Sequence, residues 1–254
     1  MKFLQALKEA IASLSANKTR SLLTVLGIVI GVGAVIGVLS IGQGAEASII
    51  GQIESIGTNV IYVYRGNSAK NVTNPRRLTL TDADALSNRV RAPHILNVAS
   101  VLFGQTSVRF GDESTQTSIM GVAENYAEVT DLDLSEGSFF TESNVTSRSS
   151  VVVVGPELAE RLTGRRTGII GTTVHINNYP FRVVGITTAK GGSQFSNPDL
   201  DVYIPITTMQ MRVQRQSDTN AVDFLLIQAQ DSQSIDLAIQ EAKSILRTTH
   251  RLTS

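Results

Sequence analysis

Residues 22–41 read LLTVLGIVIGVGAVIGVLSI, and only Thr24 and Ser40 interrupt this run of apolar side chains and glycines. The charge-free segment around it covers residues 21–45. At about 1.5 Å per residue, a helix of this run is about 30 Å long, which matches the hydrocarbon core of a bilayer. We therefore predict a transmembrane helix over residues 21–45. A buried helix of a soluble protein is the weaker alternative, because apolar residues here surround the helix instead of forming one stripe.

The charges on either side of this segment predict its orientation. Four basic residues and one acidic residue precede it, Lys18 and Arg20 lie closest to it, and no Lys or Arg follows until Arg65. Because positive flanks stay on the cytoplasmic side, we expect Lys18 and Arg20 to set the topology, with the N-terminus in the cytoplasm and most of the chain outside. A cleaved signal peptide with Ala45-Glu46-Ala47 as its cleavage site is disfavoured, because the leader and the apolar run are both too long.

The leader itself has helical periodicity. Its apolar residues fall within an arc of about 100° on a helix, opposite polar and charged residues; they are Phe3, Leu4, Leu7, Ile11 and Leu14. We predict a cytoplasmic amphipathic helix over residues 1–20 that lies in the membrane interface. A solvated leader with accidental periodicity is the alternative.

The apolar segment contains two pairs of glycines with three residues between them. These pairs are Gly27/Gly31 and Gly33/Gly37. Small residues at this spacing let helix backbones approach closely in lipid, so we predict that the four glycines pack against other membrane helices. Glycine is also common in single membrane spans, which is the simpler reading of any one pair.

Composition limits the function of the remaining 210 or so residues, which suffice for one large or two small domains. The whole chain has a net charge of zero, but its first twenty residues are basic and the rest is weakly acidic. Phosphate binding needs clustered Lys and Arg, so nucleic acid is not an expected partner. The chain has no cysteine, which excludes disulfides, thiolate metal sites and thiol nucleophiles.

The pattern after residue 45 mixes strands and helices, which predicts an α+β fold. We expect strands over 59–64, 151–154, 172–176, 181–187, 202–204 and 221–229, and a strand-like region over 95–122 with a hairpin turn at Gly111-Asp112. Asn177-Asn178 predicts a second hairpin, between 172–176 and 181–187. We expect helical segments over 45–55, 157–162 and 207–213, and the second of these has Pro156 at the early helical position that proline prefers. We also expect a short helix from Leu80 capped by Thr81, and a last helix capped by Ser232 with Ile235, Ile239, Ala242 and Ile245/Leu246 as its apolar face.

No constellation for catalysis or cofactor binding emerges. Residues 42–47 match the dinucleotide pattern G-x-G-x-x-A, but a membrane helix precedes them instead of a strand, so we expect no nucleotide there. The chain has no G-x-x-x-x-G-K-[ST] phosphate loop and no G-x-S-x-G motif. Its isolated histidines and its i, i+2 aspartate pairs more often serve structural roles; they are His94, His175 and His250, and Asp82/Asp84, Asp131/Asp133 and Asp199/Asp201. We predict a protein that is not an enzyme and needs no cofactor or metal.

Several segments together resemble the MacB-type permeases of ABC transporters, in the superfamily that includes FtsX and the LolC/LolE exporters. They are ANKTRSLLTVLGIVIGV over 16–32, Gly42-Gln43-Gly44-Ala45, Ile56-Gly57-Thr58-Asn59, LTLTDADAL over 78–86, EGSFF over 136–140, Val154-Gly155-Pro156, FRVVGI over 181–186, Lys190-Gly191-Gly192-Ser193 and Val202-Tyr203-Ile204-Pro205. Their order and spacing match across essentially the whole chain, which is more specific than any single motif.

The resemblance implies a periplasmic core domain. Residues 46–100 and 222–254 would form a porter-like α/β subdomain and residues 101–221 an inserted small α/β subdomain. If so, Tyr62 and Leu226 lie in one sheet. The resemblance also implies a non-catalytic permease subunit of a bacterial inner membrane that works as a homodimer or with a partner permease, together with a separate ABC ATPase and possibly a periplasmic adaptor protein. Such permeases transmit ATPase-driven motion to the exterior domain for export of substrate.

One departure from the family keeps an alternative open. Family members have three more membrane helices after this domain, whereas this sequence ends at Ser254. We therefore retain a second hypothesis, a single-span membrane-anchored sensor or binding module that works without an ATPase. The glycine pairs favour the permease, and the missing helices favour the sensor. A third reading, a secreted hydrolase, lacks a catalytic constellation.

Overall fold

The structure is a computed structural model that describes residues 18–54, 59–66, 76–192, 197–214 and 220–250. The chain forms two compact units, residues 1–54 and 55–254, which we treat separately. We call the described part of the second unit the sheet domain. The amphipathic helix predicted for residues 1–20 lies outside the described residues, except for its last three residues.

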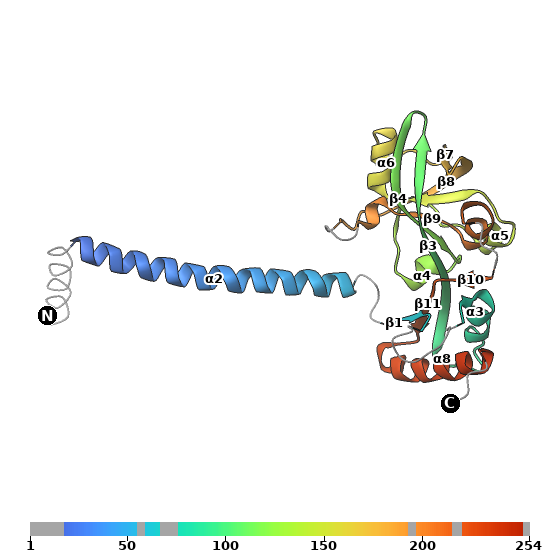
Figure 1. Ribbon diagram of the computed structural model, residues 1–254, viewed down its shortest axis with the longest axis horizontal. Coiled ribbons are helices and arrows are strands. Elements are labelled where there is room, and N and C mark those ends of the chain that lie inside the picture. The colour runs from blue at the N-terminus through green and yellow to red at the C-terminus, as the bar shows by residue number, and fades with distance from the viewer. Residues whose placement is uncertain (1–17, 55–58, 67–75, 193–196, 215–219, 251–254) are drawn as a thin grey trace. The chain divides into compact units, whose positions relative to one another are not determined.

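The described part of the first unit is one long helix, α2, which runs without a break from Lys18 to Glu54 (Figure 1). Its 37 residues span about 55 Å, which exceeds the thickness of a bilayer core. The predicted apolar helix and its predicted helical continuation after residue 45 are therefore confirmed as parts of one element. The stretch Lys18–Ser40 is long and apolar enough to cross a membrane.

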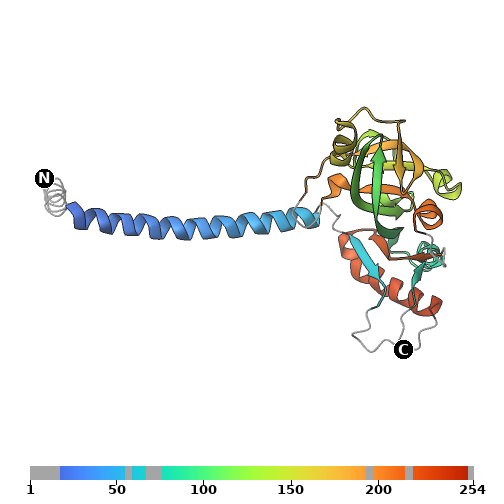
Figure 2. The same ribbon diagram turned by 45° about the horizontal axis from the view of Figure 1, so that its top comes forward.

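The sheet domain is built on one nine-stranded mixed sheet (Figures 1 and 2). Its strands pair in the order β1-β11-β3-β4-β9-β6-β8-β5, and β7 pairs with β3 and β8. All neighbours are antiparallel except β4/β9 and β6/β8. The bounds are Val60–Tyr64 for β1, Ile95–Phe110 for β3, Glu113–Val122 for β4, Leu134–Gly137 for β5, Val151–Val154 for β6, Thr173–Ile176 for β7, Tyr179–Thr187 for β8, Val202–Pro205 for β9 and Phe224–Ala229 for β11.

Short helices and one small ladder complete the sheet domain. The ladder pairs β2 (Leu78–Thr79) with β10 (Ala221–Val222). The helices are α3 (Leu80–Leu86), α4 (Tyr126–Val129), α5 (Glu142–Thr146), α6 (Pro156–Thr163), α7 (Ile206–Thr208) and α8 (Ile235–Thr249), with 3₁₀ turns at Pro198–Leu200 (η2) and Ser232–Ser234 (η4) and a π-helical turn, η3, at Met209–Val213. This mixture confirms the α+β fold class.

Side chains alternate between the two faces of the sheet and build a core on each. In β11, Leu225 and Ile227 join the larger core with buried residues of α3 and α8, whereas Leu226 between them joins a second core. The predicted pairing of the first exterior strand with the return strand is confirmed, because Tyr62 lies directly opposite Leu226 in the β1/β11 ladder.

The two predicted hairpins are confirmed together with their turn chemistry. Gly111 has a φ of 60° between β3 and β4, and Asn177 and Asn178 have φ of 46° and 71° between β7 and β8. Positive φ at both Asn177 and Asn178 is characteristic of a type I′ turn, whereas positive φ at Gly111 alone suits a type II′ turn, which has glycine at its first central position. The twist of both turn types matches that of the flanking strands.

Three local predictions are wrong. The N-cap of α3 is Thr79, not Thr81, because the capping box pairs Thr79 with Asp82 three residues later. Asp231, not Ser232, caps the turn that begins the last helical segment. The predicted strand over 221–229 is two strands, since β10 pairs with β2 and β11 pairs with β3.

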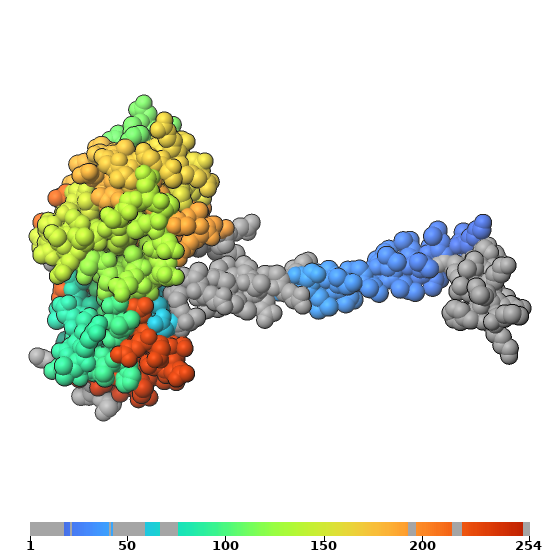
Figure 3. All heavy atoms as spheres, turned by 180° about the vertical axis from the view of Figure 1, so that it is seen from behind, coloured from blue at the N-terminus to red at the C-terminus, as the bar shows by residue number. Residues whose placement is uncertain are grey.

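Segments that are far apart in sequence gather into two parts of the sheet domain. Within the sheet domain, the teal and red residues lie together in Figure 3, and the green, yellow and orange residues form a second mass. We call the first set, residues 59–66, 76–100 and 222–250, the α8 lobe, and the described residues of 101–221 the α6 lobe. Strand β3 runs from one into the other. The division into a porter-like subdomain and an insertion stays a prediction.

Candidate functional site

The side chains of the apolar stretch of α2 are exposed. The large apolar residues from Leu22 to Leu39 are between 50% and 70% exposed, and they lie all around the helix. The hydroxyl of Thr24 donates a hydrogen bond to the carbonyl of Arg20, so the helix satisfies this polar group itself. Such a surface is stable in lipid and costly in water, because backbone and polar groups are paired internally while apolar area is exposed.

The four glycines of α2 form two narrow faces instead of one. Gly27, Gly31, Gly33 and Gly37 all have open space where a side chain would begin. At 3.6 residues per turn, the Gly27/Gly31 pair points about 120° away from the Gly33/Gly37 pair. Lys18 and Arg20 are exposed at the start of the same helix. The packing role of the glycines and the topology-setting role of the two cations stay predictions.

Two histidines that looked isolated in sequence make long-range contacts with carboxylates. His94 Nδ1 lies 2.5 Å from Glu241 Oε1, and the backbone N–H of His94 donates to the other oxygen of that carboxylate. His250 Nε2 lies 2.9 Å from Asp82 Oδ2. The contact of Glu241 joins α8 to His94, in the segment between α3 and β3, and the contact of His250 joins the end of α8 to α3. In the part of the chain that the structure describes, no three His, Cys, Asp or Glu side chains lie close enough together to hold a metal ion. The third histidine, His175, lies in β7.

Two long-range hydrogen bonds join the first and last described residues of the α8 lobe to its interior. Asn59 is hydrogen-bonded to Ala229 at the end of β11, shortly before α8 begins. His250, the last described residue, caps the other end of α8 and contacts Asp82. As a 15-residue helix, α8 is about 22 Å long, so the contact of His250 lies about that far from the first residue of the helix.

Asp82 is buried and stabilises the N-terminus of α3. Burial raises the pKa of its carboxyl, but hydrogen bonds from His250, Thr79 and Thr249 outweigh burial and hold the pKa below its usual value. Replacing Asp82 with alanine should lower the free energy of unfolding at pH 7 by about 1–2 kcal/mol, since the capping box and the His250 contact are lost together. Thermal unfolding of the protein and of the Asp82→Ala variant measures this.

The pH dependence of that effect has a definite sign. A carboxyl with a lowered pKa in the folded state contributes stability above its ordinary pKa, and this stability is lost as the pH falls through the folded value. The difference between the protein and the variant should therefore shrink below about pH 4. Asp84→Ala, an exposed aspartate on the same helix, is the control and should change little. A difference that stays constant down to pH 2 would contradict the ionic part of this account.

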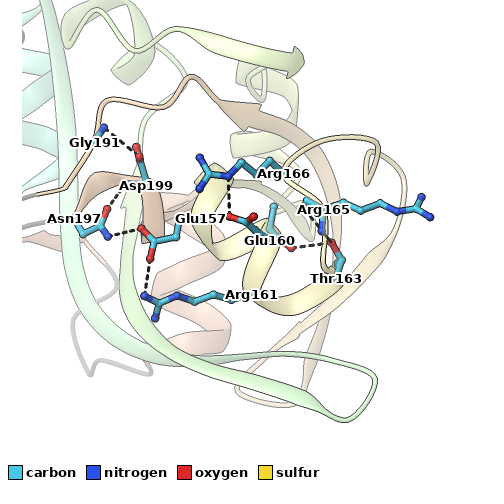
Figure 4. A network of polar contacts seen from close by, with 10 residues as sticks. Glu157, Glu160, Arg161, Thr163, Arg165, Arg166, Gly191, Asn197 and Asp199 are labelled. Atoms are coloured by element: carbon cyan, nitrogen blue, oxygen red, sulfur yellow. Dashed lines mark hydrogen bonds and ion pairs between the residues drawn. The ribbon is translucent and has the colours of Figure 1, made fainter.

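The start of α6 is tied to the loop after β8 by a polar network (Figure 4). Asn197 donates to Glu157, and Arg161 pairs with the other oxygen of that carboxylate. These hydrogen bonds, from Asn197 first and Arg161 second, lower the pKa of Glu157. In the same network the buried carboxylate of Asp199 accepts the backbone N–H groups of Lys190 and Gly191.

Asp201, the residue before β9, has a raised carboxyl pKa, in contrast to Glu157. It is half-buried, and burial first and the neighbouring Asp199 second raise the pKa of its carboxyl to about 6. Of the predicted aspartate pairs, Asp199/Asp201 therefore combines one hydrogen-bonded carboxylate with one that resists ionisation. No histidine or nucleophile contacts either carboxylate among the described residues, so the pair has the character of a structural element.

The dinucleotide-like pattern is part of a helix. Gly42-Gln43-Gly44-Ala45-Glu46-Ala47 lies within the continuous α2. The fingerprint works by ending a strand and presenting the N-terminus of a new helix to a pyrophosphate, and residues in the middle of a helix present no such N–H groups. The sequence interpretation of this segment as a helix continuation is confirmed.

The chain matches known sequences over nearly its whole length. A family model described as the MacB-like periplasmic core domain matches residues 21–245. The chain is 32% identical over 256 residues to the macrolide export ATP-binding/permease protein MacB of Chlorobium luteolum, which covers 99% of this chain and 38% of that relative. It is 31% identical over 238 residues to the MacB protein of Vibrio parahaemolyticus, covering 93% of this chain and 36% of that relative. The chain thus spans less than two-fifths of these relatives' length.

Two solved structures share the fold of the sheet domain. The periplasmic region of MacB from Actinobacillus actinomycetemcomitans matches with a TM-score of 0.64 and 23% identity, covering 78% of this chain and 87% of that one. The extracellular domain of the noncanonic ABC-type transporter YknZ from Gram-positive bacteria matches with a TM-score of 0.63 and 21% identity, covering 77% and 96%.

Proposed function

This chain belongs to the family of MacB-like periplasmic core domains, and we propose that it is the N-terminal membrane helix and extracytoplasmic domain of a non-catalytic permease in an ABC transporter for export. The observation that carries the proposal is the direct succession of an apolar helix, exposed all around, and a sheet domain with the fold of MacB and YknZ exterior domains. In this proposal α2 crosses the inner membrane with Lys18 and Arg20 in the cytoplasm, and the sheet domain lies outside.

Two observations support the proposed partners: this sequence has no phosphate loop, and its relatives are named as ATP-binding/permease proteins. The sequence has no phosphate loop, so the ATP must be bound by another polypeptide or another part of a longer one. The relatives in the comparison are named as ATP-binding/permease proteins for macrolide export. We propose that an ABC ATPase drives a dimer of this permease, or a pair with a second permease, and that a periplasmic adaptor protein receives the substrate.

The proposed mechanism is mechanical. Motion of the membrane helices would reach the exterior through β1, which follows α2 within six residues and is paired along its whole length with β11. The α8 lobe would take up this motion, and β3 would carry it into the α6 lobe. The single-span sensor remains the rival proposal, and it predicts no dependence on an ATPase.

The test measures ATP-dependent motion of the exterior. The full-length gene product that contains this chain is reconstituted in nanodiscs with its ATPase, and spin labels at Asp112, an exposed turn residue of the α6 lobe, report the distance between two copies. The permease proposal expects a distance that differs between ATP and ADP and is unchanged by nucleotide when the ATPase is omitted. Identical distances in ATP and ADP with an active ATPase would contradict it and favour the sensor.

Replacing Gly31 with leucine should weaken assembly at least about tenfold while insertion is retained, because the larger side chain separates backbones that small residues bring together. Leucine favours insertion in lipid, so the amount of protein in the membrane should not fall. Cross-linking yield in membranes measures the association. The matched control is Val32→Leu, which lies about 120° from both glycine faces of α2. Equal losses in both variants would refute a role of the Gly27/Gly31 face.

A further inference from the structure

The peptide unit of Phe103, in the middle of β3, is held by side chains on one side instead of by a neighbouring strand. The ladder between β3 and β11 ends where Val101 pairs with Phe224, while the ladder to β4 continues on the other side of β3. Beyond this point, the N–H of Phe103 donates to Asp223 Oδ2 at 2.8 Å. The carbonyl of Phe103 accepts a hydrogen bond from Gln214 Nε2 at 2.9 Å. Both main-chain groups of one residue are thus satisfied by side chains from two other segments.

Asp223 stands where the returning chain changes its partner. Before it, β10 pairs with β2, and after it, β11 pairs with β3. The N–H of Asp223 still donates to the carbonyl of Val101, which is the last backbone hydrogen bond between this segment and β3. The next N–H of β3 on this side, that of Phe103, is accepted by the Asp223 side chain instead of by a backbone carbonyl. The side chain is exposed, and its carboxylate forms no ion pair in the part of the chain that the structure describes.

Gln214 is positioned by the α6 lobe. It follows the π-helical turn η3, whose first residue, Met209, is fully buried against two glycines of β3 and β4. A side chain at Gly104 or Gly121 would lie within 3.1 Å of Met209, and at Gly104 it would also meet the amide of Gln214 at 2.6 Å. These glycines therefore leave the space in which η3 packs and Gln214 reaches the Phe103 carbonyl.

We propose that Asp223 and Gln214 form a latch on the Phe103 peptide that sets the angle between the α8 lobe and the α6 lobe. The latch lies where the two chain segments joining the lobes, β3 and the segment around Asp223, run side by side. A hydrogen bond from a side chain can open by a rotamer change, whereas opening a ladder requires the strands to separate. The junction can thus bend when the latch opens, and both lobes stay folded. This inference rests on the proposed division of the sheet domain into two lobes.

The test measures the distance between the lobes within one molecule. Spin labels are attached at Val90, which is 92% exposed in the α8 lobe, and at Asp112 in the α6 lobe. The full-length gene product is measured in nanodiscs without nucleotide, diluted with unlabelled protein so that only distances within one copy are seen. In the Asp223→Ala variant we expect a distance distribution at least about twofold wider than without that substitution, because the Phe103 N–H loses its acceptor.

Two further variants separate a latch from general destabilisation. Asp223→Asn keeps an acceptor oxygen and should restore the narrow distribution, and Gln214→Ala should widen it as Asp223→Ala does. Asp236→Ala, which removes an exposed aspartate from α8, is the control and should leave the distribution unchanged. Equal widths in the Asp223→Ala protein and its parent would overturn the latch, as would a failure of asparagine to restore the width. Because no nucleotide is present, this result is independent of whether ATP moves the exterior.

Discussion

Replacing Gly155 with alanine should lower the free energy of unfolding of the sheet domain by about 2–4 kcal/mol. An added Cβ would lie 2.2 Å from the carbonyl oxygen of Asp199 and 2.4 Å from its carbonyl carbon. These are backbone atoms that cannot move aside by a rotamer change, so α6 or the η2 turn must shift. The backbone angles of Gly155, φ −70° and ψ 150°, suit any residue, which makes the clash the dominant cause.

Thermal and urea unfolding of the purified protein measure this effect, and a domain of this size should lose about 2–4 °C in Tm per kcal/mol. Gly164→Ala is the matched control at the other end of α6. Gly164 has a positive φ of 74° but open space around its Cα, so alanine there should cost only about 1 kcal/mol. If Gly155→Ala lowered the free energy of unfolding no more than Gly164→Ala does, the contact between Gly155 and Asp199 would be looser than in the structure.

Replacing Asp201 with asparagine should raise the free energy of unfolding at pH 7 by about 2–3 kcal/mol, because a tenfold change in an acid dissociation constant corresponds to about 1.4 kcal/mol. The pKa of Asp201 is raised to about 6 in the folded chain, first by burial and then by Asp199. Its ordinary value is about 3.9, so the folded state binds more protons than the unfolded state between about pH 4 and 6.

The sign of this linkage gives a second readout. Stability attributable to Asp201 falls as the pH rises from about 4 to 6, and asparagine should remove that part of the pH dependence. Urea unfolding at pH 4 and pH 7 measures it, and the gain from Asp201→Asn should be small at pH 4. Asp133→Asn, an exposed aspartate, is the control and should change stability little at either pH. No gain at pH 7 would mean that Asp201 ionises without cost. The effect is opposite in sign to that of Asp82, whose pKa is lowered.

The elements that the sequence predicted well are those set by local patterns. The apolar run of α2, the glycine and asparagine turns, and the proline at the start of α6 each depend on residues within a few positions of one another. The capping box of α3 was also readable, because Thr79 precedes Asp82 by three residues, but the neighbouring Thr81 drew the prediction away. The break at Asp223 was not readable, since it depends on β2 and β3, which belong to remote parts of the chain.

The contacts that matter most in the sheet domain are long-range. Asp82 and His250 are 168 residues apart, and Phe103 and Asp223 are 120 apart. No local pattern in the sequence predicts that such residues are in contact until the order of the strands in the sheet is known. Roles for the glycines and cations of α2 could be predicted from sequence because a bilayer imposes rules on every residue of a membrane helix, and these roles stay predictions. A polar contact inside a folded domain follows no comparable rule.

Two carboxylate–histidine contacts hold α8 at separate points along its axis. Glu241 lies within α8 and His250 caps the helix nine residues later, which corresponds to about 13 Å along the axis. Because Glu241 contacts His94 and His250 contacts Asp82, α8 cannot slide along its axis or pivot about one contact without breaking the other. A displacement of α3 or of the segment around His94 is therefore passed to the whole helix as a movement of one rigid body.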